Sequence, residues 1–454
     1  MEVLLARLEN PERATPTIHV AGSKGKGSTA AMIASTLTAA GLRTGLFTSP
    51  HLHRMTERIR VDMDEISPGR FAALVEELWP DVEAVEGRGD VGRVSVFELL
   101  TAMAFVEFRD VGAQAQVIEV GLGGRLDATN LVTPEVAVIT PISLDHTAVL
   151  GDTVPKIAYE KAGIIKPGIP VVVGRQAPAA RKVIDQTAAE RGSHVTYAHD
   201  RLQLEHGPVQ TARTGRSTVQ RIRLRGPSDD YEIDLPLPGD HQIDNAITAV
   251  VALELFAKRR DFKIGPDLIS RGLAAVRWPA RAEILTSVDD AVQVIVDGAH
   301  NSSSAAALVS TLETLFPSPG RTVLIYAGSG GHDFAATARE FARLNPQVVV
   351  TRTRHPKAVD PHTVADALRR DNVAVAAITS DVKSALREAR IIAAAGDVIV
   401  ATGSLFVAAE VREALLSIAP ELYPDLRGEM TTPYEKPVLI SADQPGPNAR
   451  LGAG

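Results

Sequence analysis

Apolar and polar positions follow two periodicities along the first 280 residues. Short runs rich in valine and isoleucine end at glycine or polar residues, and stretches with apolar residues at helical spacing lie between them. Unbroken apolar runs of this length are typical of parallel strands that are buried on both faces. The pattern therefore predicts an α/β domain around a parallel sheet. Its expected strands are 17–21, 116–120, 136–141 and 170–174, and its expected helices include 70–78 and 96–108.

The pattern changes between residues 202 and 237, where apolar residues partly alternate with charged ones. Such alternation indicates a small antiparallel β region with one face toward solvent. A helix is expected to begin near Gln242, and Pro279 then interrupts the chain before strands and helices alternate again. The later strands are expected at 292–296, 322–327, 347–351 and 398–401, with helices that include 303–315 and 404–416.

Two domains follow from this pattern, and a length of 454 residues is enough for both to bury a core. We expect residues 1–280 to form the parallel-sheet domain with its antiparallel β subregion. Residues 281–430 are expected to form a smaller, Rossmann-like α/β domain. Residues 431–454 are rich in proline, glycine and alanine with little periodicity, which predicts a flexible tail.

Composition narrows the class of protein. The chain has 48 basic and 55 acidic residues, a formal charge of −7, so electrostatics gives no basis for a nucleic-acid partner. It has no cysteine, which excludes disulfides, thiolate metal sites and thioester chemistry. No apolar run reaches the roughly 18 residues of a membrane helix. We expect a cytoplasmic monomer that acts on small molecules and has no membrane partner.

The clearest chemical signal follows the first predicted strand. Residues 21–29 read Ala-Gly-Ser-Lys-Gly-Lys-Gly-Ser-Thr and lead into an apolar helical stretch. Glycines let successive backbone N–H groups point at phosphate oxygens, and the helix N-terminus adds a positive dipole end. Lys26 would reach the β- and γ-phosphates, and Ser28 or Thr29 would face the nucleotide and its Mg²⁺. A glycine-rich turn without a ligand would not need this lysine and serine, so we predict a nucleoside triphosphate site.

Polar residues also follow other predicted strands. Glu119 ends the second strand, where a carboxylate is well placed for Mg²⁺, and the glycines after it lack the spacing of a dinucleotide fingerprint. His146 follows the third strand beside an aspartate, which favours a catalytic or metal role over simple packing. Lys161 beside Glu160 would by default lie on a solvated helix face. The turn at 297–301 is either a simple strand-to-helix turn or one wall of a ligand cleft.

Taken in order, these motifs resemble the folylpolyglutamate synthase family of the Mur ligase superfamily over about residues 17–410. The resemblance implies an ATP-dependent amide ligase. It would phosphorylate the γ-carboxylate of a reduced folate and let the amino group of L-glutamate attack the acyl phosphate. Some members of the family also join glutamate to dihydropteroate, and the sequence leaves open whether this chain does so. The motifs that carry the resemblance are 22–28, 48–52, 57–59, 119–130, 144–147, 160–164, His241, Gln242, Asn245, Arg281 and 297–301.

The resemblance also implies roles for individual residues. It places Lys26, His146, Lys161 and His300 in catalysis, with Lys161 at the position of a lysine that is carbamylated in the family. Two Mg²⁺ ions would be held by Ser49, Glu119 and His146. The folate or dihydropteroate pocket would include Phe97, Glu98 and Asp127. The nucleotide would be held by Gly22, Gly25, Lys26, Gly27, Ser28, Gln242, Asn245, Arg281 and Asp297.

Two departures and two alternatives remain. Lys24 stands where many relatives have asparagine, and residues 328–333 keep only His332 and Asp333 of a more usual Asp-Lys-Asp arrangement. A peptidoglycan-precursor Mur ligase would run the same chemistry, but such enzymes usually carry a substrate domain ahead of the phosphate loop. A non-catalytic nucleotide-binding module would explain the loop but not the set Glu119, His146 and Lys161.

Overall fold

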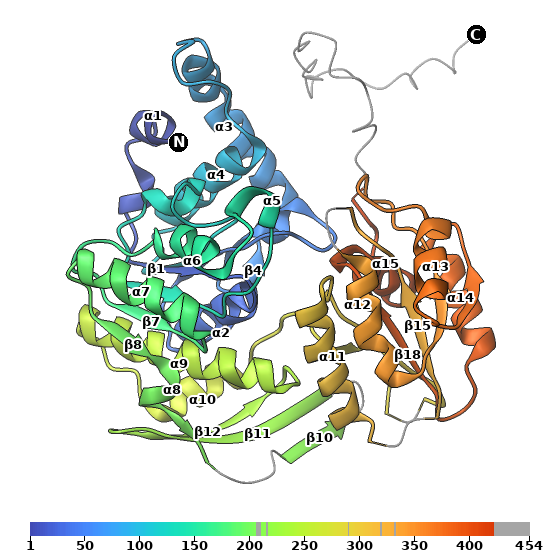
Figure 1. The fold of residues 1–454 in the computed structure, drawn as a ribbon. Coiled ribbons are helices and arrows are strands. Elements are labelled where there is room, and N and C mark those ends of the chain that lie inside the picture. The colour runs from blue at the N-terminus through green and yellow to red at the C-terminus, as the bar shows by residue number, and fades with distance from the viewer. Residues whose placement is uncertain (206–209, 215–216, 289, 318–319, 331–332, 422–454) are drawn as a thin grey trace, which may run out of the picture. The chain divides into compact units, whose positions relative to one another are not determined.

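The computed structural model describes residues 1–421 apart from 206–209, 215–216, 289, 318–319 and 331–332 (Figure 1). The expected tail at 431–454 and His332 lie outside the described residues. Residues 1–421 belong to one unit of the chain, which contains three sheets. The structure confirms an α/β fold with a large, mainly parallel sheet and a second α/β sheet nearer the C-terminus.

The first sheet has eight strands in the order β4-β3-β2-β5-β1-β6-β7-β8. Strands β2, β5, β1, β6, β7 and β8 run parallel, and β3 and β4 add an antiparallel edge. The strands expected near 17–21, 116–120, 136–141 and 170–174 are present, whereas β2 and β8 were not expected. The strand bounds are β1 Thr17–Ala21, β2 Thr44–Phe47, β3 Ile59–Val61, β4 Asp64–Glu65, β5 Ala115–Glu119, β6 Val136–Ile139, β7 Val171–Val173 and β8 Val195–Tyr197.

Helices cover both faces of this sheet, which explains why its strands read as unbroken apolar runs. Side chains of α2, α9 and α10 form one core with alternate residues of the strands, such as Ile18, Val20 and Val138. The intervening residues face α1, α3 and α4 or α6 and α7 on the opposite side. The bounds are α1 Glu2–Arg7, α2 Lys26–Ala39, α3 Pro68–Glu86, α4 Val96–Asp110, α5 Thr147–Leu150, α6 Val154–Ala162, α7 Pro178–Glu190, α8 Ala198–Arg201, α9 Asp240–Arg260 and α10 Pro266–Ala274, with short 3-10 turns at Pro11–Arg13, Met55–Arg58 and Ala128–Leu131.

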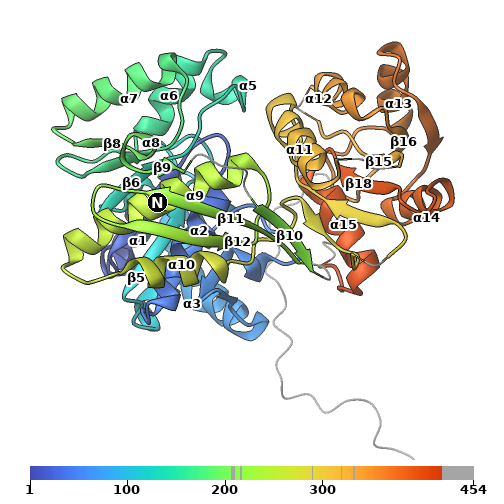
Figure 2. The same cartoon turned by 90° about the horizontal axis from the view of Figure 1, so that it is seen from below.

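The second sheet confirms the antiparallel region expected between residues 202 and 237. Strand β11 (Ser217–Arg225) pairs with β10 (Gln210–Thr214), β12 (Asp230–Leu235) and β9 (Gln203–Leu204). Ile222 and Ile233 lie opposite each other and join the core formed by α9 and α10. The alternate positions carry cross-strand ion pairs such as Arg221–Asp234, which accounts for the face that was expected to lie toward solvent. Figure 2 shows these strands beside α9 and α10.

The third sheet has six strands in the order β13-β14-β18-β15-β16-β17, parallel except for β13 (Glu283–Ile284). Helices α11, α12 and α13 cover one face, and α14 and α15 cover the other. The strand at β14, which we expected to be the first of this region, is preceded by β13. The remaining bounds are β14 Gln293–Val296, α11 Ser302–Leu315, β15 Thr322–Tyr326, α12 Phe334–Phe341, the 3-10 turn Ala342–Leu344, β16 Gln347–Val350, α13 Pro361–Arg370, β17 Val375–Ile378, α14 Val382–Ile392, β18 Val398–Thr402 and α15 Leu405–Leu416.

Two further findings complete the fold. Helix α3 is longer than expected, because it continues through Pro80 to Glu86. A proline inside a helix usually removes one hydrogen bond and bends the helix, yet α3 remains helical on both sides of Pro80. Within the described part of the chain, no helix is long and apolar enough to cross a membrane.

Candidate functional site

The phosphate loop between β1 and α2 depends on two glycines. Gly22 has φ +151°, and a Cβ there would lie 1.9 Å from Thr140 Oγ1. Gly25 has φ +82°, and a Cβ there would lie 2.2 Å from Asn245 Oδ1. The backbone N–H groups of residues 23 and 24 both donate to Pro141 O, at 3.0 and 3.2 Å. The loop is therefore fixed against the end of β6 and the start of α9.

Helix α2 begins at Lys26 and the Thr29 N–H donates to Gly25 O, so the N–H groups ahead of residue 29 at this helix end remain for an anion. The first N–H groups of an α-helix have no intrahelical acceptor. Lys26, Gly27 and Ser28 line a cavity at this helix end. Thr29 is fully buried and does not line the cavity, so Ser28 is the member of the pair Ser28 and Thr29 that lines it.

This cavity, which we call the phosphate-loop cavity, has a volume of about 970 Å³. Its walls come from the carboxyl ends of β1, β5 and β6, the first turn of α9, and the carboxyl ends of β14 and β18. Ligands of parallel α/β sheets bind at such strand ends. The structure brings the following predicted site residues to it: Gly25, Lys26, Gly27, Ser28, Ser49, Phe97, Glu119, Asp127, His146, Gln242, Asn245, Arg281, Asp297 and His300.

Glu119 ends β5 and is almost completely buried beside the phosphate loop. Its Oε2 accepts a hydrogen bond from the Ser49 N–H at 3.0 Å. Burial raises the pKa of its carboxyl group, and the nearby cations Lys26 and Arg281 only partly oppose this effect. A buried carboxylate with too little positive charge around it is suited to a cation. Among the described residues no group of three or more His, Cys, Asp and Glu is arranged to hold a metal ion.

Asp145 and His146 follow β6 and differ in their surroundings. The side chain of Asp145 is 6% exposed and its Oδ2 lies 2.9 Å from Lys24 Nζ. Although burial opposes ionisation, Lys24 lowers the pKa of Asp145 to about 2. His146 has a left-handed backbone at φ +50°, and its side chain is 51% exposed, with Nε2 3.9 Å from Asp145 Oδ1. His146 is one of the residues that line the phosphate-loop cavity.

Lys161 does not lie on a solvated helix face, so the default prediction for this residue was wrong. It is 3% exposed on α6, and its Nζ donates a hydrogen bond to Gly22 O at 2.8 Å. Burial lowers the pKa of Lys161 to about 7, and Lys26 acts in the same direction. The helix pattern did not reveal this because the phosphate loop, far away in sequence, covers the α6 face that carries Lys161.

The third sheet contributes Arg281, Asp297 and His300. Asp297 Oδ2 accepts from the Ala282 N–H at 2.7 Å, and its Oδ1 accepts from the Ala299 N–H at 2.8 Å. Burial raises the pKa of Asp297, while Arg281 opposes this effect. Both oxygens of Asp297 thus already hold the turn that positions His300.

Gln242 and Asn245 are buried in the first turns of α9. Asn245 Nδ2 donates to Gln242 Oε1 at 3.0 Å, and Asn245 Oδ1 faces the phosphate loop at Gly25. The pair therefore packs against the loop at Gly25. This contact gives a physical reason for an amide at position 245.

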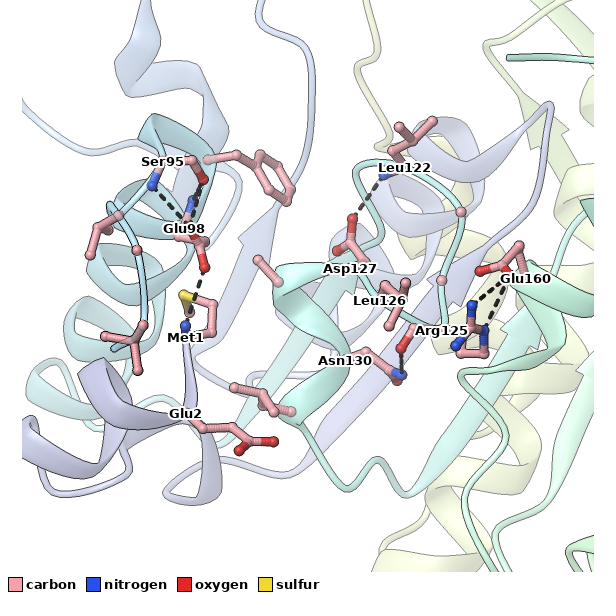
Figure 3. A pocket seen from close by; sticks show the side chains of 18 of the residues that line it. Met1, Glu2, Ser95, Glu98, Leu122, Arg125, Leu126, Asp127, Asn130 and Glu160 are labelled. Carbon is pink, nitrogen blue, oxygen red and sulfur yellow. Dashed lines mark hydrogen bonds and ion pairs between the residues drawn. The ribbon is translucent and has the colours of Figure 1, made fainter. Parts of the chain in front are cut away.

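A second cavity of about 1040 Å³, which we call the α4 cavity, lies beside the N-terminus of α4 (Figure 3). Phe97, Leu122 and Asp127 line both cavities, so the two adjoin. Glu98 is held in a capping box with Ser95, and its Oε1 accepts from the Met1 ammonium at 3.2 Å. The Oδ2 atom of Asp127 accepts from the Leu122 N–H at 2.8 Å. The carboxylates of Glu98 and Asp127 thus shape the cavity as well as lining it.

Sequence reasoning missed two sets of contacts. Lys24 Nζ lies within 3.3 Å of His300 Nε2 as well as bonding to Asp145. His19, which is fully buried on β1, has Nε2 2.9 Å from Thr129 Oγ1, and this hydroxyl donates to Asp127 Oδ1 at 2.6 Å. The unusual Lys24 was the one available signal. The sequence around His19 contains no signal that predicts its connection to Asp127.

Comparison with known proteins identifies the family of the chain. The family model for the Mur ligase middle domain matches residues 96–253, and that for the Mur ligase glutamate ligase domain matches residues 280–405. A folylpolyglutamate synthase of Lacticaseibacillus casei is 35% identical over 430 residues, covering 91% of this chain and 93% of that protein. The chain belongs to the folylpolyglutamate synthase family of Mur ligases. This finding confirms the family resemblance drawn from the motifs.

Other members of the family agree in sequence and in fold. A dihydrofolate synthase/folylpolyglutamate synthase of Mycobacterium tuberculosis is 36% identical over 380 residues, covering 80% of this chain and 76% of that protein. The solved structure of M. tuberculosis folylpolyglutamate synthase complexed with ADP matches with a TM-score of 0.84 at 34% identity, covering 92% and 94% of the two chains. The structure of E. coli FolC in complex with DHPP and ADP matches with a TM-score of 0.79 at 29% identity, covering 91% and 92%.

Proposed function

We propose that this chain is an ATP-dependent ligase that joins the amino group of L-glutamate to the γ-carboxylate of a reduced folate. The observation that carries this proposal is the junction of the two cavities at Phe97, Leu122 and Asp127. An acid held in the α4 cavity can extend its carboxylate toward a triphosphate on the phosphate loop. Family membership and the ADP complexes of relatives support the same assignment.

The reaction needs activation because a carboxylate is a poor electrophile at neutral pH. A carboxylate oxygen attacks the γ-phosphorus of ATP, the bond from that phosphorus to the β–γ bridging oxygen breaks, and ADP leaves. The amine nitrogen then attacks the acyl carbon, the acyl C–O bond to phosphate breaks, and inorganic phosphate leaves. Two protons leave the nitrogen when a substrate ammonium becomes an amide. The protein mainly supplies positioning and charge stabilisation for such transfers.

The phosphate loop supplies the groups that bind and orient the nucleotide. The N–H groups at the start of α2 and the hydroxyl of Ser28 bind phosphate oxygens. Lys26 places its ammonium beside the transferred phosphoryl group, where negative charge develops. We assign Gln242, Asn245, Arg281 and Asp297 to the remaining walls of the nucleotide site, in keeping with their places around the phosphate-loop cavity.

The residues around Glu119 fit a divalent cation. Its buried carboxylate has a raised pKa, and the Ser49 hydroxyl and the exposed His146 ring line the same cavity. We assign Mg²⁺ to Glu119, Ser49 and His146, which together offer oxygen and nitrogen donors. A bound cation there would neutralise phosphate charge during transfer.

Lys161 fits the carbamylation that the family resemblance implies. A lowered pKa of about 7 leaves a large share of neutral amine at physiological pH. A neutral amine adds to carbon dioxide, forming an N–C bond and releasing one proton, which yields a carbamate anion. The cations at positions 24 and 26 already lower the pKa of Lys161 and would stabilise that anion instead.

The α4 cavity supports a folate-type substrate. Phe97 offers an aromatic ring at the junction, and Gly121 passes so close that a Cβ there would lie 2.4 Å from Phe97 Cζ. Tetrahydrofolate and dihydropteroate share the pteroyl skeleton and differ in the reduction of the ring and in the glutamate, so we assign both to this cavity. We retain dihydrofolate synthase as a second activity, supported by the bifunctional M. tuberculosis relative.

The decisive experiment is an ADP-release assay on the purified protein. Tetrahydrofolate and dihydropteroate are offered separately, each with and without L-glutamate. Release of ADP that needs both an acid and glutamate supports the proposal, and the acid that works identifies the activity. ATP turnover with a UDP-linked peptidoglycan precursor instead would favour a cell-wall ligase. Binding of nucleotide without any turnover would favour a non-catalytic module.

A further inference from the structure

Lys24 lies where the ends of two different sheets meet, although it belongs to the phosphate loop. Its Nζ is 2.9 Å from Asp145 Oδ2 and 3.3 Å from His300 Nε2. Asp145 follows β6 of the first sheet, and His300 follows β14 of the third sheet. The ammonium therefore bridges two strand ends on opposite walls of the phosphate-loop cavity.

The backbone below Lys24 fixes where this ammonium can go. The Lys24 N–H donates to Pro141 O at 3.2 Å, and the Ser23 hydroxyl donates to Ser143 O at 3.0 Å. These bonds tie the loop to the same segment that carries Asp145. The three N–H bonds of an ammonium can rotate to suit two acceptors, whereas an amide at this position would have a shorter side chain.

The surroundings of His300 define its tautomer. Its Nδ1 lies 2.9 Å from Gly298 O, and a carbonyl oxygen can only accept, so Nδ1 carries a proton. Its Nε2 faces the Lys24 ammonium, which can only donate, so Nε2 presents a lone pair. His300 is therefore a neutral imidazole in a single tautomer. The Ser304 hydroxyl accepts from the His300 backbone N–H at 3.1 Å and holds the turn in place.

Charges of both signs surround this bridge. Asp145 Oδ2 lies 2.9 Å from Lys24 Nζ, and the side chains are 6% and 22% exposed, so the two form a largely buried ion pair. Burial and the cations Lys26 and Arg281 lower the pKa of Lys24, while Asp145 opposes them. The carboxylate of Asp145 thus keeps the ammonium in place against its cationic neighbours.

We propose that Lys24 is a positioning residue that holds His300 as a neutral imidazole with the Nε2 lone pair turned toward the amino substrate. This inference rests on the proposed ligase function. The ammonium of the incoming amino acid is a donor of the same type as Lys24, so it takes the Nε2 lone pair while Asp145 retains Lys24. One N–H bond of the substrate then breaks, Nε2–H forms, and the neutral amine attacks the acyl phosphate. His300 is the catalytic residue in this step, and Lys24 sets its state.

Spectroscopy tests the tautomer without substrates. The full-length, nucleotide-free protein is labelled with ¹⁵N-histidine, and His300→Gln assigns its ring signals in a long-range ¹H–¹⁵N spectrum. We expect the wild type and the surface control Lys182→Met to show one protonated Nδ1 and an unprotonated Nε2. Lys24→Met, which keeps the chain length but removes the donor, should give mixed or averaged tautomer signals.

Kinetics test the consequence. In the ADP-release assay we expect Lys24→Met to raise KM for the amino acid about 10-fold and to lower kcat about 10-fold, with KM for ATP changed less than about threefold. Lys24→Arg keeps a cationic donor and should recover part of the loss. A binding role for Lys24 toward phosphate would instead raise KM for ATP.

Two results would overturn the inference. One is an unchanged His300 tautomer in Lys24→Met together with an unchanged KM for the amino acid. The other is an effect of Lys24→Met that is confined to a raised KM for ATP. If the wild type shows no acid-dependent turnover with any substrate, the proposed function fails, but the spectrum of His300 still decides whether Lys24 sets its tautomer.

Discussion

Two glycines with nearly the same backbone angle offer a direct test of the phosphate-loop geometry. Gly25 has φ +82° and lies against Asn245, whereas Gly41 has φ +85° with nothing within 4 Å of a Cβ. Alanine in the left-handed region costs about 1–2 kcal/mol at either position. The pair Gly25→Ala and Gly41→Ala therefore separates backbone strain from the contact with Asn245.

The contact adds a second cost at Gly25 alone. An added Cβ would lie 2.2 Å from Asn245 Oδ1, and C···O contacts are normally no shorter than about 3.3 Å, so the amide must retreat by roughly 1 Å. This movement stretches the bond from Asn245 Nδ2 to Gln242 Oε1, which is 3.0 Å long. Losing that bond and crowding the site cost about 1–3 kcal/mol more. We expect Gly25→Ala to lower the free energy of unfolding by about 2–5 kcal/mol and Gly41→Ala by about 1–2 kcal/mol.

Nucleotide binding is the sharper assay, because it reports on the loop and not only on stability. Calorimetric titration with ADP should show at least about a tenfold weaker Kd for Gly25→Ala, since every 1.4 kcal/mol is about tenfold. Gly41→Ala, at the far end of α2, should bind ADP as the wild type does. Equal stability losses in the two variants with an unchanged Kd would refute the assigned contact between the loop and α9.

Three further outcomes are expected. Lys161→Met should lower the turnover about 100-fold. It should also remove the carbamate carbon signal that the wild type gives with ¹³C-bicarbonate. A fully active wild-type protein that shows no such signal would contradict the carbamate. Thr129→Val should raise KM for the folate about 10-fold, because Asp127 loses the hydroxyl donor of Thr129, which His19 also contacts. Thr129→Ser keeps the hydroxyl and should show the wild-type KM. Equal KM values in the two variants would contradict this chain of contacts. Burial lowers the pKa of His19 to about 3, so the unfolded state binds more protons between pH 3 and 6.5 and stability falls as pH falls through that window. Between pH 7.5 and 5.5 chemical unfolding should show a loss of about 1.4 kcal/mol that is absent from His19→Gln, and an equal loss in that variant would exclude His19 as the cause.

The fold could be predicted wherever burial on both faces leaves an unbroken apolar run. Strand β1 was predicted closely because Thr17–Ala21 is fully buried and Gly22 follows it directly. Strand β17 was missed because its residues are only half-buried or exposed at the edge of the third sheet. An edge strand loses the apolar signal on which the prediction depends.

The candidate site was predictable in its members but not in their contacts. Lys26 and Glu119 could be named from strand ends and glycine spacing, because parallel strands bring their carboxyl ends to one edge. The burial of Lys161 could not be predicted, since the carbonyl that accepts its hydrogen bond belongs to Gly22, 139 residues earlier in the chain. Contacts of this range depend on the packing of whole elements and leave no periodic trace in the sequence.

The same packing explains why a lysine is tolerated beside the phosphate loop at position 24. A free ammonium there would add to the charge of Lys26 and further disfavour an ammonium on Lys161. Asp145 offsets that charge, and its pKa of about 2 keeps it ionised over the working pH range. Lys24 and Asp145 therefore act as a pair, so replacing Asp145 alone should disturb both the loop and His300. The departure from the family pattern at Lys24 is thus accommodated by a carboxylate of the 144–147 motif, which the structure places within hydrogen-bond distance of the lysine at the end of β6.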